Sequence, residues 1–246
     1  FTGSAAGWGS LLDQFASTGL RIIALDLHGH GQTDSPEDYQ RYSIESCQVD
    51  ILAALAQLQV EPGEACLLGY SMGGRIALYT AFSGFFKSLI LESTSPGLAT
   101  EEERKQRRAS DEALASRIED EGLAGFVAYW EHIPLFASQR SLPSSTQQNL
   151  HNQRLHNNPR GLANSLCGVG TGSQPDLRAR LPELHIPVLL ITGELDQKFS
   201  KLAREMQTAL PQAIWHEIPQ AGHTVHLEQP ATFVSLVTDF LAQAGK

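Results

Sequence analysis

Ser71 is the residue whose surroundings predict chemistry most clearly. It lies in the motif Gly69-x-Ser71-x-Gly73, which follows an apolar run at residues 65–68 and precedes a helical pattern beginning near Ile76. Strand, sharp turn and helix in this order are typical of a nucleophile elbow, in which the serine takes a strained backbone conformation and its hydroxyl stands exposed. The glycines remove Cβ atoms that would clash in so tight a turn. A glycine-rich turn with an incidental serine is the alternative, and the flanking strand and helix favour the elbow.

The backbone amide of Met72 is the first candidate for stabilising a negatively charged oxygen next to Ser71. It would begin the helix that follows the elbow, where unpaired N–H groups and the positive end of the helix dipole favour an anion. We therefore expect this amide to be one half of an oxyanion hole.

A serine nucleophile needs a base and a carboxylate that orients the base, all at the same edge of a sheet. Asp196 comes just after one predicted strand and His223 just after the next. The chain order serine, aspartate, histidine is that of α/β-hydrolases. A surface histidine in a loop is the alternative for His223, and Glu194, on the same loop as Asp196, is the alternative acid. We predict the triad Ser71, His223 and Asp196.

Basic residues indicate the class of substrate. Arg75 lies four positions after Ser71, about one helical turn, and therefore on the same face of the predicted helix. A guanidinium is costly to bury there unless an anion or an acidic partner meets it. Further arginines lie in a predicted helical insertion, with the first three expected on one helix face: Arg104, Arg107, Arg108 and Arg154. For those three, a solvated face balanced by the glutamates at 101–103 is the alternative. Because a planar guanidinium matches carboxylates, we expect a small substrate with several negative charges.

The elements that position these residues alternate as a parallel sheet with crossover helices requires. Strand-like segments are predicted at residues 21–27, 65–68, 88–91, 187–192 and 214–218. Helices outside the insertion are predicted at residues 8–15, 43–58, 200–210 and 230–241. Between about residues 97 and 172 the strand-like runs stop, and helices are expected at 101–118 and 123–132. We expect one domain, residues 1–246, with this insertion as a helical cap over the catalytic edge.

Composition excludes several classes of function. The 246 residues carry a net charge of −9, which argues against nucleic acid or an anionic membrane as a partner. Apolar runs stay below the roughly 20 residues that a membrane span needs. The three cysteines, Cys47, Cys66 and Cys167, are odd in number and scattered, which indicates a reducing compartment such as the cytoplasm. The sequence begins without Met, so a removed leader would also allow a plastid or another organelle.

Metal and phosphate motifs are not found in the sequence. The histidines of His28-x-His30 and His223-x-x-His226 match neither a helical zinc motif nor a Cys/His cluster. A phosphate-binding P-loop sequence does not occur either. We predict no metal ligands.

Four stretches of the sequence together resemble the 2-succinyl-6-hydroxy-2,4-cyclohexadiene-1-carboxylate synthases (MenH) of the α/β-hydrolase superfamily. They are Asp-Leu-His-Gly-His-Gly at 26–31, Gly-Tyr-Ser-Met-Gly-Gly-Arg at 69–75, Ser-Pro-Gly-Leu at 95–98 with the arginines at 104, 107 and 108, and Gly-Glu-Leu-Asp-Gln-Lys-Phe at 193–199. The likeness covers nearly the whole chain. It implies the α/β-hydrolase fold, with a mostly parallel sheet flanked by helices and a helical cap.

The resemblance also implies a reaction and the residues of its site. The reaction is a lyase step of menaquinone or phylloquinone biosynthesis that eliminates pyruvate from 2-succinyl-5-enolpyruvyl-6-hydroxy-3-cyclohexene-1-carboxylate, without cofactor or metal. Ser71, activated by His223 and Asp196, would remove a ring proton. The residues implied to line the anion pocket are Tyr70, Arg75, Arg107, Trp130 and Arg154.

The beginning of the sequence departs from the family pattern. Members place a strand and His-Gly before the Phe-Thr-Gly-Ser with which this sequence starts, so we expect N-terminal strands to be missing from it. Phe1 would supply the second amide of the oxyanion hole. A serine hydrolase of esters or C–C bonds, with the same triad, is the alternative function, and a non-catalytic binding module is a further one. The sequence does not predict the oligomeric state.

Overall fold

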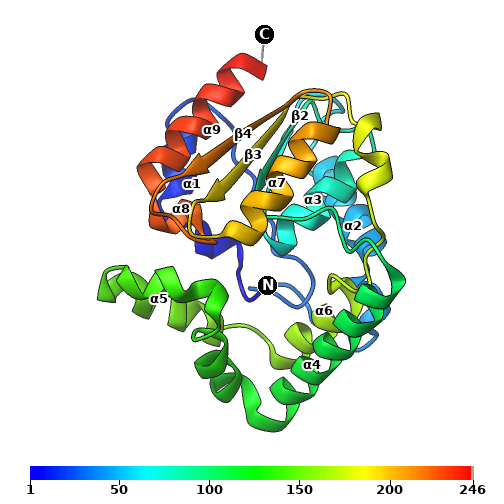
Figure 1. Ribbon diagram of the computed structural model, residues 1–246, viewed down its shortest axis with the longest axis vertical. Helices are drawn as coiled ribbons and strands as arrows, with labels where there is room; N and C mark the ends of the chain where they lie inside the picture. Colours follow the sequence, from blue (N-terminus) through cyan, green and yellow to red (C-terminus); the bar gives the residue numbers. More distant parts are fainter. Residues whose placement is uncertain (245–246) are drawn as a thin grey trace.

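Four of the predicted strands form one parallel sheet in the computed structural model, which describes residues 1–244 (Figure 1). The strands are β1 (Cys66–Tyr70), β2 (Ser88–Glu92), β3 (Val188–Gly193) and β4 (Ala213–Ile218), side by side in this order. Their register pairs Tyr70 with Glu92 and Gly193 with Ile218. The carboxyl ends of the strands therefore lie along one edge of the sheet, where the loops that follow them meet.

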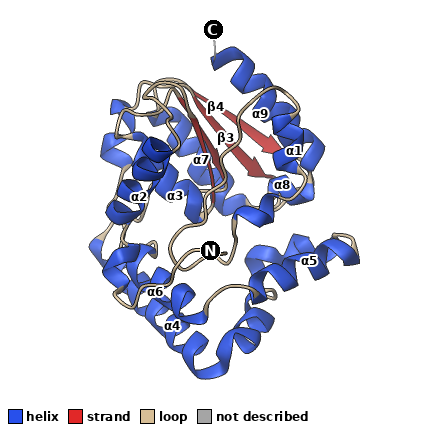
Figure 2. Cartoon of the chain, turned by 180° about the vertical axis from the view of Figure 1, so that it is seen from behind, coloured by secondary structure: helices blue, strands red, loops and turns tan. Residues whose placement is uncertain are grey.

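Helices cover both faces of the sheet (Figures 1 and 2). The strands β2 and β3 are buried along their whole length, and their central residues are apolar on both faces of the sheet, at positions 89–91 and 188–191. Leu89 and Leu91 pack on one side with α3 (Met72–Ala81) and α7 (Gln197–Ala209). Ile90 packs on the other side with α1 (Leu11–Ala16) and α9 (Pro230–Ala244). The predicted layers of an α/β fold are confirmed.

Local signals explain where several helices begin and end. Helix α2 (Ile44–Gln57) packs against α3, and its N-cap is Ser43, whose side chain accepts a hydrogen bond from the backbone of Ser46. The helix predicted at residues 8–15 is instead a short 3-10 helix, η1 (Ala5–Trp8), followed by α1, because Gly9 takes a positive φ of 50°. Two other short elements are η2 (Tyr39–Tyr42) and α8 (Val225–Glu228).

A helical segment connects β2 to β3, and we call residues 97–172 the cap segment. It contains α4 (Glu101–Trp130), η3 (Pro134–Ser141), α5 (Ser144–Leu155) and α6 (Pro159–Val169), and η4 (Arg178–Glu183) follows it. A capping box of Thr100 and Glu103 starts α4. The two helices predicted at residues 101–118 and 123–132 are confirmed: α4 consists of two helical parts joined by a kink at Gly122, whose φ of 72° and ψ of 169° are not helical. Helices α4 and α6 pack on each other below the sheet in Figure 1.

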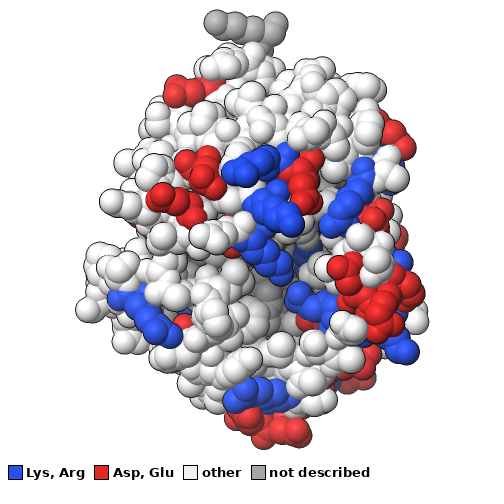
Figure 3. All heavy atoms as spheres, in the orientation of Figure 1, with Lys and Arg blue, Asp and Glu red and all other residues white. Residues whose placement is uncertain are grey.

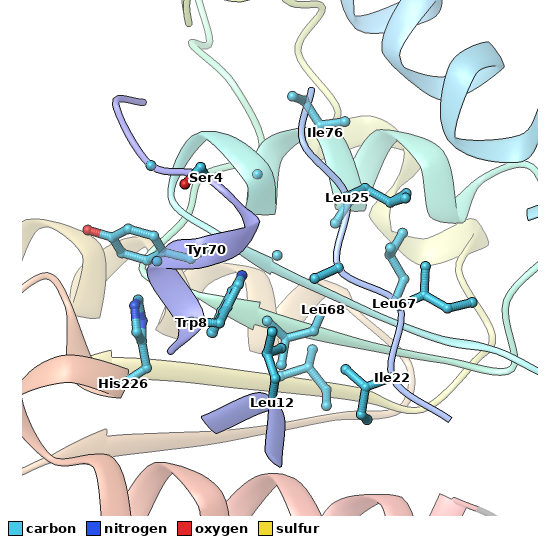
Figure 4. A pocket seen from close by; sticks show the side chains of 18 of the residues that line it. Ser4, Trp8, Leu12, Ile22, Leu25, Leu67, Leu68, Tyr70, Ile76 and His226 are labelled. Carbon is cyan, nitrogen blue, oxygen red and sulfur yellow. The ribbon is translucent and has the colours of Figure 1, made fainter. Parts of the chain in front are cut away.

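The strand predicted at residues 21–27 is not formed. The segment has no ladder partner among the described residues, and Leu25 is 38% exposed. A mainly apolar cavity of about 600 Å³ lies between this segment and β1, lined by Ile22 and Leu25 on one side and by Leu67 and Leu68 on the other (Figure 4). A strand requires a hydrogen-bonded neighbour, and residues 21–27 are separated from the edge of β1 by this cavity. The prediction of a strand at residues 21–27 was therefore wrong.

No helix among residues 1–244 combines the length and the apolar content needed to cross a lipid bilayer.

Candidate active site

Ser71, His223 and Asp196 meet at the carboxyl edge of the sheet. Ser71 follows β1, Asp196 follows β3 and His223 follows β4. Nε2 of His223 lies 2.9 Å from Oγ of Ser71, and Nδ1 of His223 lies 2.6 Å from Oδ2 of Asp196. When Nδ1–H donates to the carboxylate, Nε2 is free to accept the serine proton. The arrangement can therefore make Ser71 a base or a nucleophile.

The turn at Ser71 has the strained backbone of a nucleophile elbow. Its φ of 51° and ψ of −110° place a non-glycine residue in the left-handed half of conformational space. Two bonds hold this turn: the backbone N–H of Ser71 donates to the carbonyl of Glu92, and the hydroxyl of Thr94 donates to the carbonyl of Ser71. We infer that the serine hydroxyl is fixed before any ligand arrives.

The glycines around the elbow differ from the expectation in one respect. A Cβ on Gly69 would collide with the carbonyl of Gly73, as the motif predicts. A Cβ on Gly73 would meet nothing within 4 Å, whereas one on Gly74 would lie 2.6 Å from Cβ of Thr94. The close approach after the serine therefore requires Gly74 and not Gly73.

The two candidate acids are separated by the structure. Asp196 is 8% exposed, accepts a hydrogen bond from the backbone of Phe199 at the start of α7, and meets His223. Glu194 is exposed and accepts a hydrogen bond from the backbone of Gln220 instead. The geometry thus selects Asp196 as the partner of His223.

Met72 and Phe1, the two predicted donors of an oxyanion hole, both line the cavity beside β1. The N–H of Met72 is the first of α3 and has no acceptor within the helix. Phe1 lines the same cavity as Met72, and its ring lies 5.3 Å from the ring of Trp130.

Among residues 1–244, Arg75 is a buried cation that makes no direct hydrogen bond to a carboxylate. It is 7% exposed, and its Nη1 donates to the carbonyl of Val169 at 2.9 Å and to Oε1 of Gln174 at 2.6 Å. Burial, followed by the charge of Arg107, lowers its pKa to about 10. Both acceptors are neutral, so an incoming anion would gain more from this guanidinium than from an already neutralised one. Arg75 does not line the cavity beside β1; it faces the end of the cap segment.

The three arginines of α4 do not act as one set, contrary to the expectation. Arg104 and Arg108 are four positions apart and both pair with the exposed Glu101, at 2.9 and 2.6 Å. Arg107 pairs with the buried Asp111 at 2.8 Å, on the side that affects Arg75. Arg104 and Arg108 therefore belong to a solvated helix face balanced by a glutamate, the alternative interpretation. Arg107 is the arginine of α4 whose charge affects Arg75.

The remaining predicted pocket residues are held by neighbours in different ways. The hydroxyl of Tyr70 lies 2.8 Å from Oγ1 of Thr224. Arg154 is 8% exposed and donates to Glu131 and to Gln139. The indole nitrogen of Trp130 is buried and has no hydrogen-bond partner among the described residues.

The sequence analysis did not identify Thr224 and Gln139, which make hydrogen bonds to the predicted pocket residues Tyr70 and Arg154. Thr224 could have been considered because it follows His223 directly. Gln139 lies in a short polar helix that carries no periodic signal, so its contact with Thr224 was not predictable from the pattern.

Lys and Arg side chains border a hollow in the face shown in Figure 3. The surface also carries many acidic groups, in agreement with the net charge of −9. Local positive charge therefore exists at the hollow despite the overall negative charge.

Other reactive side chains have structural partners. Nδ1 of His226 lies 2.7 Å from the buried Glu92, and Nε2 of His28 lies 3.2 Å from Asp50. In the part of the chain that the structure describes, no group of three or more His, Cys, Asp or Glu side chains could hold a metal ion. The three cysteines are free.

Comparison with known proteins gives consistent matches. A family model described as alpha/beta hydrolase fold matches residues 1–230. The chain is 45% identical to a provisionally named 2-succinyl-6-hydroxy-2,4-cyclohexadiene-1-carboxylate synthase of Bacillus subtilis, over 98% of this chain and 87% of that protein. It is 35% identical to the synthase of the same name from Serratia proteamaculans, over 91% of this chain and 84% of that one. The solved structure of MenH from S. aureus is similar with a TM-score of 0.93 and 33% identity, covering 100% of this chain and 92% of that chain.

Proposed function

This chain belongs to the 2-succinyl-6-hydroxy-2,4-cyclohexadiene-1-carboxylate synthase family of the α/β-hydrolase fold, and we propose that Ser71, His223 and Asp196 are its catalytic triad. The reaction is the elimination of pyruvate from 2-succinyl-5-enolpyruvyl-6-hydroxy-3-cyclohexene-1-carboxylate in menaquinone or phylloquinone biosynthesis. The observation that carries the proposal is the set of hydrogen bonds that joins Ser71 through His223 to Asp196. The buried guanidinium of Arg75, whose two hydrogen-bond acceptors among residues 1–244 are neutral, supports an anionic substrate.

The chemistry requires a base at one ring carbon. The hydrogen on C2 of the substrate is acidic because it lies next to the carbonyl of the succinyl group. His223 accepts the Ser71 proton through Nε2, and the serine oxygen removes the hydrogen from C2. The electron pair forms the C2–C3 double bond, the C3–C4 double bond shifts to C4–C5, and the bond between C5 and the enolpyruvyl oxygen breaks. The leaving group takes up a proton and becomes pyruvate.

Negative charge develops on the succinyl carbonyl oxygen during this step. In the proposal, the backbone N–H of Met72, at the start of α3, donates a hydrogen bond to that oxygen. The backbone amide of Phe1 is the second donor. Donors that are fixed before the reaction need no reorganisation when the charge appears.

The substrate carries several carboxylates, and the proposed pocket supplies donors for them. The proposed residues are Tyr70, Arg75, Arg107, Trp130 and Arg154. The unpartnered indole nitrogen of Trp130 and the neutral acceptors of Arg75 support this assignment. The proposal needs neither metal nor cofactor, and a small anionic substrate is its only partner; a reducing compartment such as the cytoplasm suits the three free cysteines.

A hydrolase of esters or C–C bonds is the second candidate, since the same serine, histidine and aspartate geometry serves acyl transfer. The test is incubation with the cyclohexene substrate and with a neutral p-nitrophenyl ester, with pyruvate and p-nitrophenol measured. We expect pyruvate release to be faster by orders of magnitude. Rapid turnover of the ester without pyruvate release would favour the hydrolase.

A further inference from the structure

A chain of buried hydrogen bonds runs from the cap segment to Tyr70, the residue before the serine. Nη2 of Arg154 donates to Oε1 of Gln139 at 3.1 Å, and Nε2 of Gln139 donates to Oγ1 of Thr224 at 2.9 Å. Oγ1 of Thr224 lies 2.8 Å from the hydroxyl of Tyr70. Gln139 is 8% exposed and Thr224 2%. The chain joins η3 and α5 of the cap segment to the loop that carries His223.

The direction of the first two bonds is fixed by chemistry. A guanidinium has only donors, so the amide oxygen of Gln139 must face Arg154. The amide nitrogen then faces Thr224, whose hydroxyl oxygen must accept. The orientation of the Gln139 amide thus follows from its charged neighbour.

The same reasoning reaches Tyr70. Among the described residues, Oγ1 of Thr224 has two hydrogen-bond partners, Gln139 and Tyr70. Since Gln139 donates, Tyr70 is the partner that can accept the single proton of Thr224. The opposite direction would leave that buried proton without an acceptor, which is unfavourable. The phenolic proton of Tyr70 is therefore not used in this series of hydrogen bonds.

The hydroxyl of Tyr70 is placed to donate that proton to a ligand. Figure 4 shows it pointing away from the apolar side chains Leu67 and Leu68 that line the cavity beside β1. The ring lies 5.3 Å from the ring of His223. Burial raises the pKa of Tyr70, so the hydroxyl stays protonated. The positive charge of Arg154, at the other end of this series of hydrogen bonds, polarises the bonds so that each donor becomes stronger.

We propose that Gln139 and Thr224 are positioning residues that, together with Arg154, fix the Tyr70 hydroxyl as a hydrogen-bond donor to a carboxylate of the substrate. The inference rests on the proposed function, because it assigns a role within that site. Arg154 then acts through Tyr70 as well as through its own charge.

A double-mutant cycle of Thr224→Val and Tyr70→Phe tests the direction of the chain. Thr224→Val keeps the shape but removes the hydroxyl, and we expect kcat/KM for pyruvate release to fall about 10-fold, as for a lost hydrogen bond to a charged group. In the Tyr70→Phe background the same change should cost less than about twofold, because no donor remains to be directed. Thr224→Ser should recover most of the loss. Equal losses in both backgrounds would overturn the inference.

Gln139→Glu tests the chain without altering Thr224 or Tyr70. A carboxylate can only accept, so Thr224 must donate to it and Tyr70 must donate to Thr224. We expect about the same 10-fold loss of kcat/KM as for Thr224→Val. Gln148→Glu introduces the same charge at an exposed position of α5 and should leave kcat/KM within about twofold. Equal effects of the two glutamates would also contradict the inference.

Succinate binding, measured by calorimetry, separates this inference from the proposed function. The same cycle should show that Thr224→Val weakens succinate binding only when Tyr70 is present. That coupling without any pyruvate release by the wild type would uphold the donor role and reject the lyase. If the wild type releases pyruvate but the effects of Thr224→Val and Tyr70→Phe on succinate binding are additive, only the donor role of Tyr70 is rejected. Failure of the wild type both to bind succinate and to release pyruvate would reject both.

Discussion

Glu92 holds His226 with both oxygens of its carboxylate. Oε2 lies 2.7 Å from Nδ1 of His226, and Oε1 accepts a hydrogen bond from the backbone of the same residue at 3.0 Å. Glu92 is fully buried at the end of β2, and its own carbonyl accepts the N–H of Ser71. His226 lies three positions after His223. Glu92 therefore holds both the segment that carries His223, through its side chain, and the turn at Ser71, through its carbonyl.

Glu92→Ala should destabilise the protein and reduce its activity. Two buried donors of His226 would lose their acceptor, which costs roughly 1–3 kcal/mol each in unfolding free energy. Glu92→Gln keeps one acceptor and should lose less. Urea unfolding and kcat are the measurements, with Glu205→Ala, an exposed glutamate of α7, as the control. A loss no greater than that of the control would mean that the pair does not support the site.

Ser71→Ala and His223→Ala should each lower kcat by at least ~10³-fold while the protein stays folded, because triad members act as a unit. The double variant should be little worse than either single one, since Nε2 of His223 acts through Ser71. Steady-state pyruvate release and circular dichroism measure both effects. Ser235→Ala, an exposed serine of α9, is the control. Multiplicative losses would show that the two residues work independently.

Asp196→Asn should lower kcat about 10⁴-fold, because an amide facing Nδ1 favours the wrong tautomer of His223. Glu194→Gln, on the same loop, should leave kcat within about twofold, since Glu194 is exposed and bonds only to the backbone of Gln220. The two variants are a matched pair for one kinetic assay. A larger loss for Glu194→Gln would reverse the assignment of the acid.

Arg75→Ala should reduce kcat/KM on the anionic substrate by about 10- to 150-fold, the equivalent of one charge-assisted hydrogen bond. Arg75→Lys should recover only part, because a point charge replaces the planar fork. Residual activity on a neutral ester should hardly change. Arg117→Ala, which removes an arginine paired with Glu121, is the control. Equal losses on both substrates would show that Arg75 only supports the packing through Val169 and Gln174.

His30 should make stability fall in mild acid. His30 is 3% exposed, and burial lowers the pKa of its imidazole from 6.5 to about 4. Between these values the unfolded chain binds a proton that the native protein does not, so the unfolding free energy decreases as the pH falls. The slope is about 1.4 kcal/mol per pH unit.

The check is urea unfolding between pH 7 and about pH 4.5. His30→Gln should remove this contribution and flatten the dependence, and His132→Gln, at an exposed position, should not. An unchanged slope in His30→Gln would show that this residue does not control the dependence.

The order of the elements, and the positions of Ser71 and His223 after their strands, followed from local pattern. Parallel strands joined by helices bring their carboxyl ends to one edge, so residues after β1, β3 and β4 had to converge. The turn at Ser71 is encoded locally by its glycines, although the structure shows that Gly74 rather than Gly73 makes the close approach.

Pairing and side-chain contacts between distant elements were decided only by the tertiary structure. Residues 21–27 have the composition of a strand, but a strand exists only if another edge lies within hydrogen-bonding distance, and the segment itself does not determine this. The choice of Asp196 over Glu194 depended on which carboxylate reaches Nδ1 of His223. Gln139 meets Thr224 across 85 positions of sequence. Such a contact depends on how the cap segment packs on the sheet, because the periodicity of one helix fixes its inner face but not the residue opposite it.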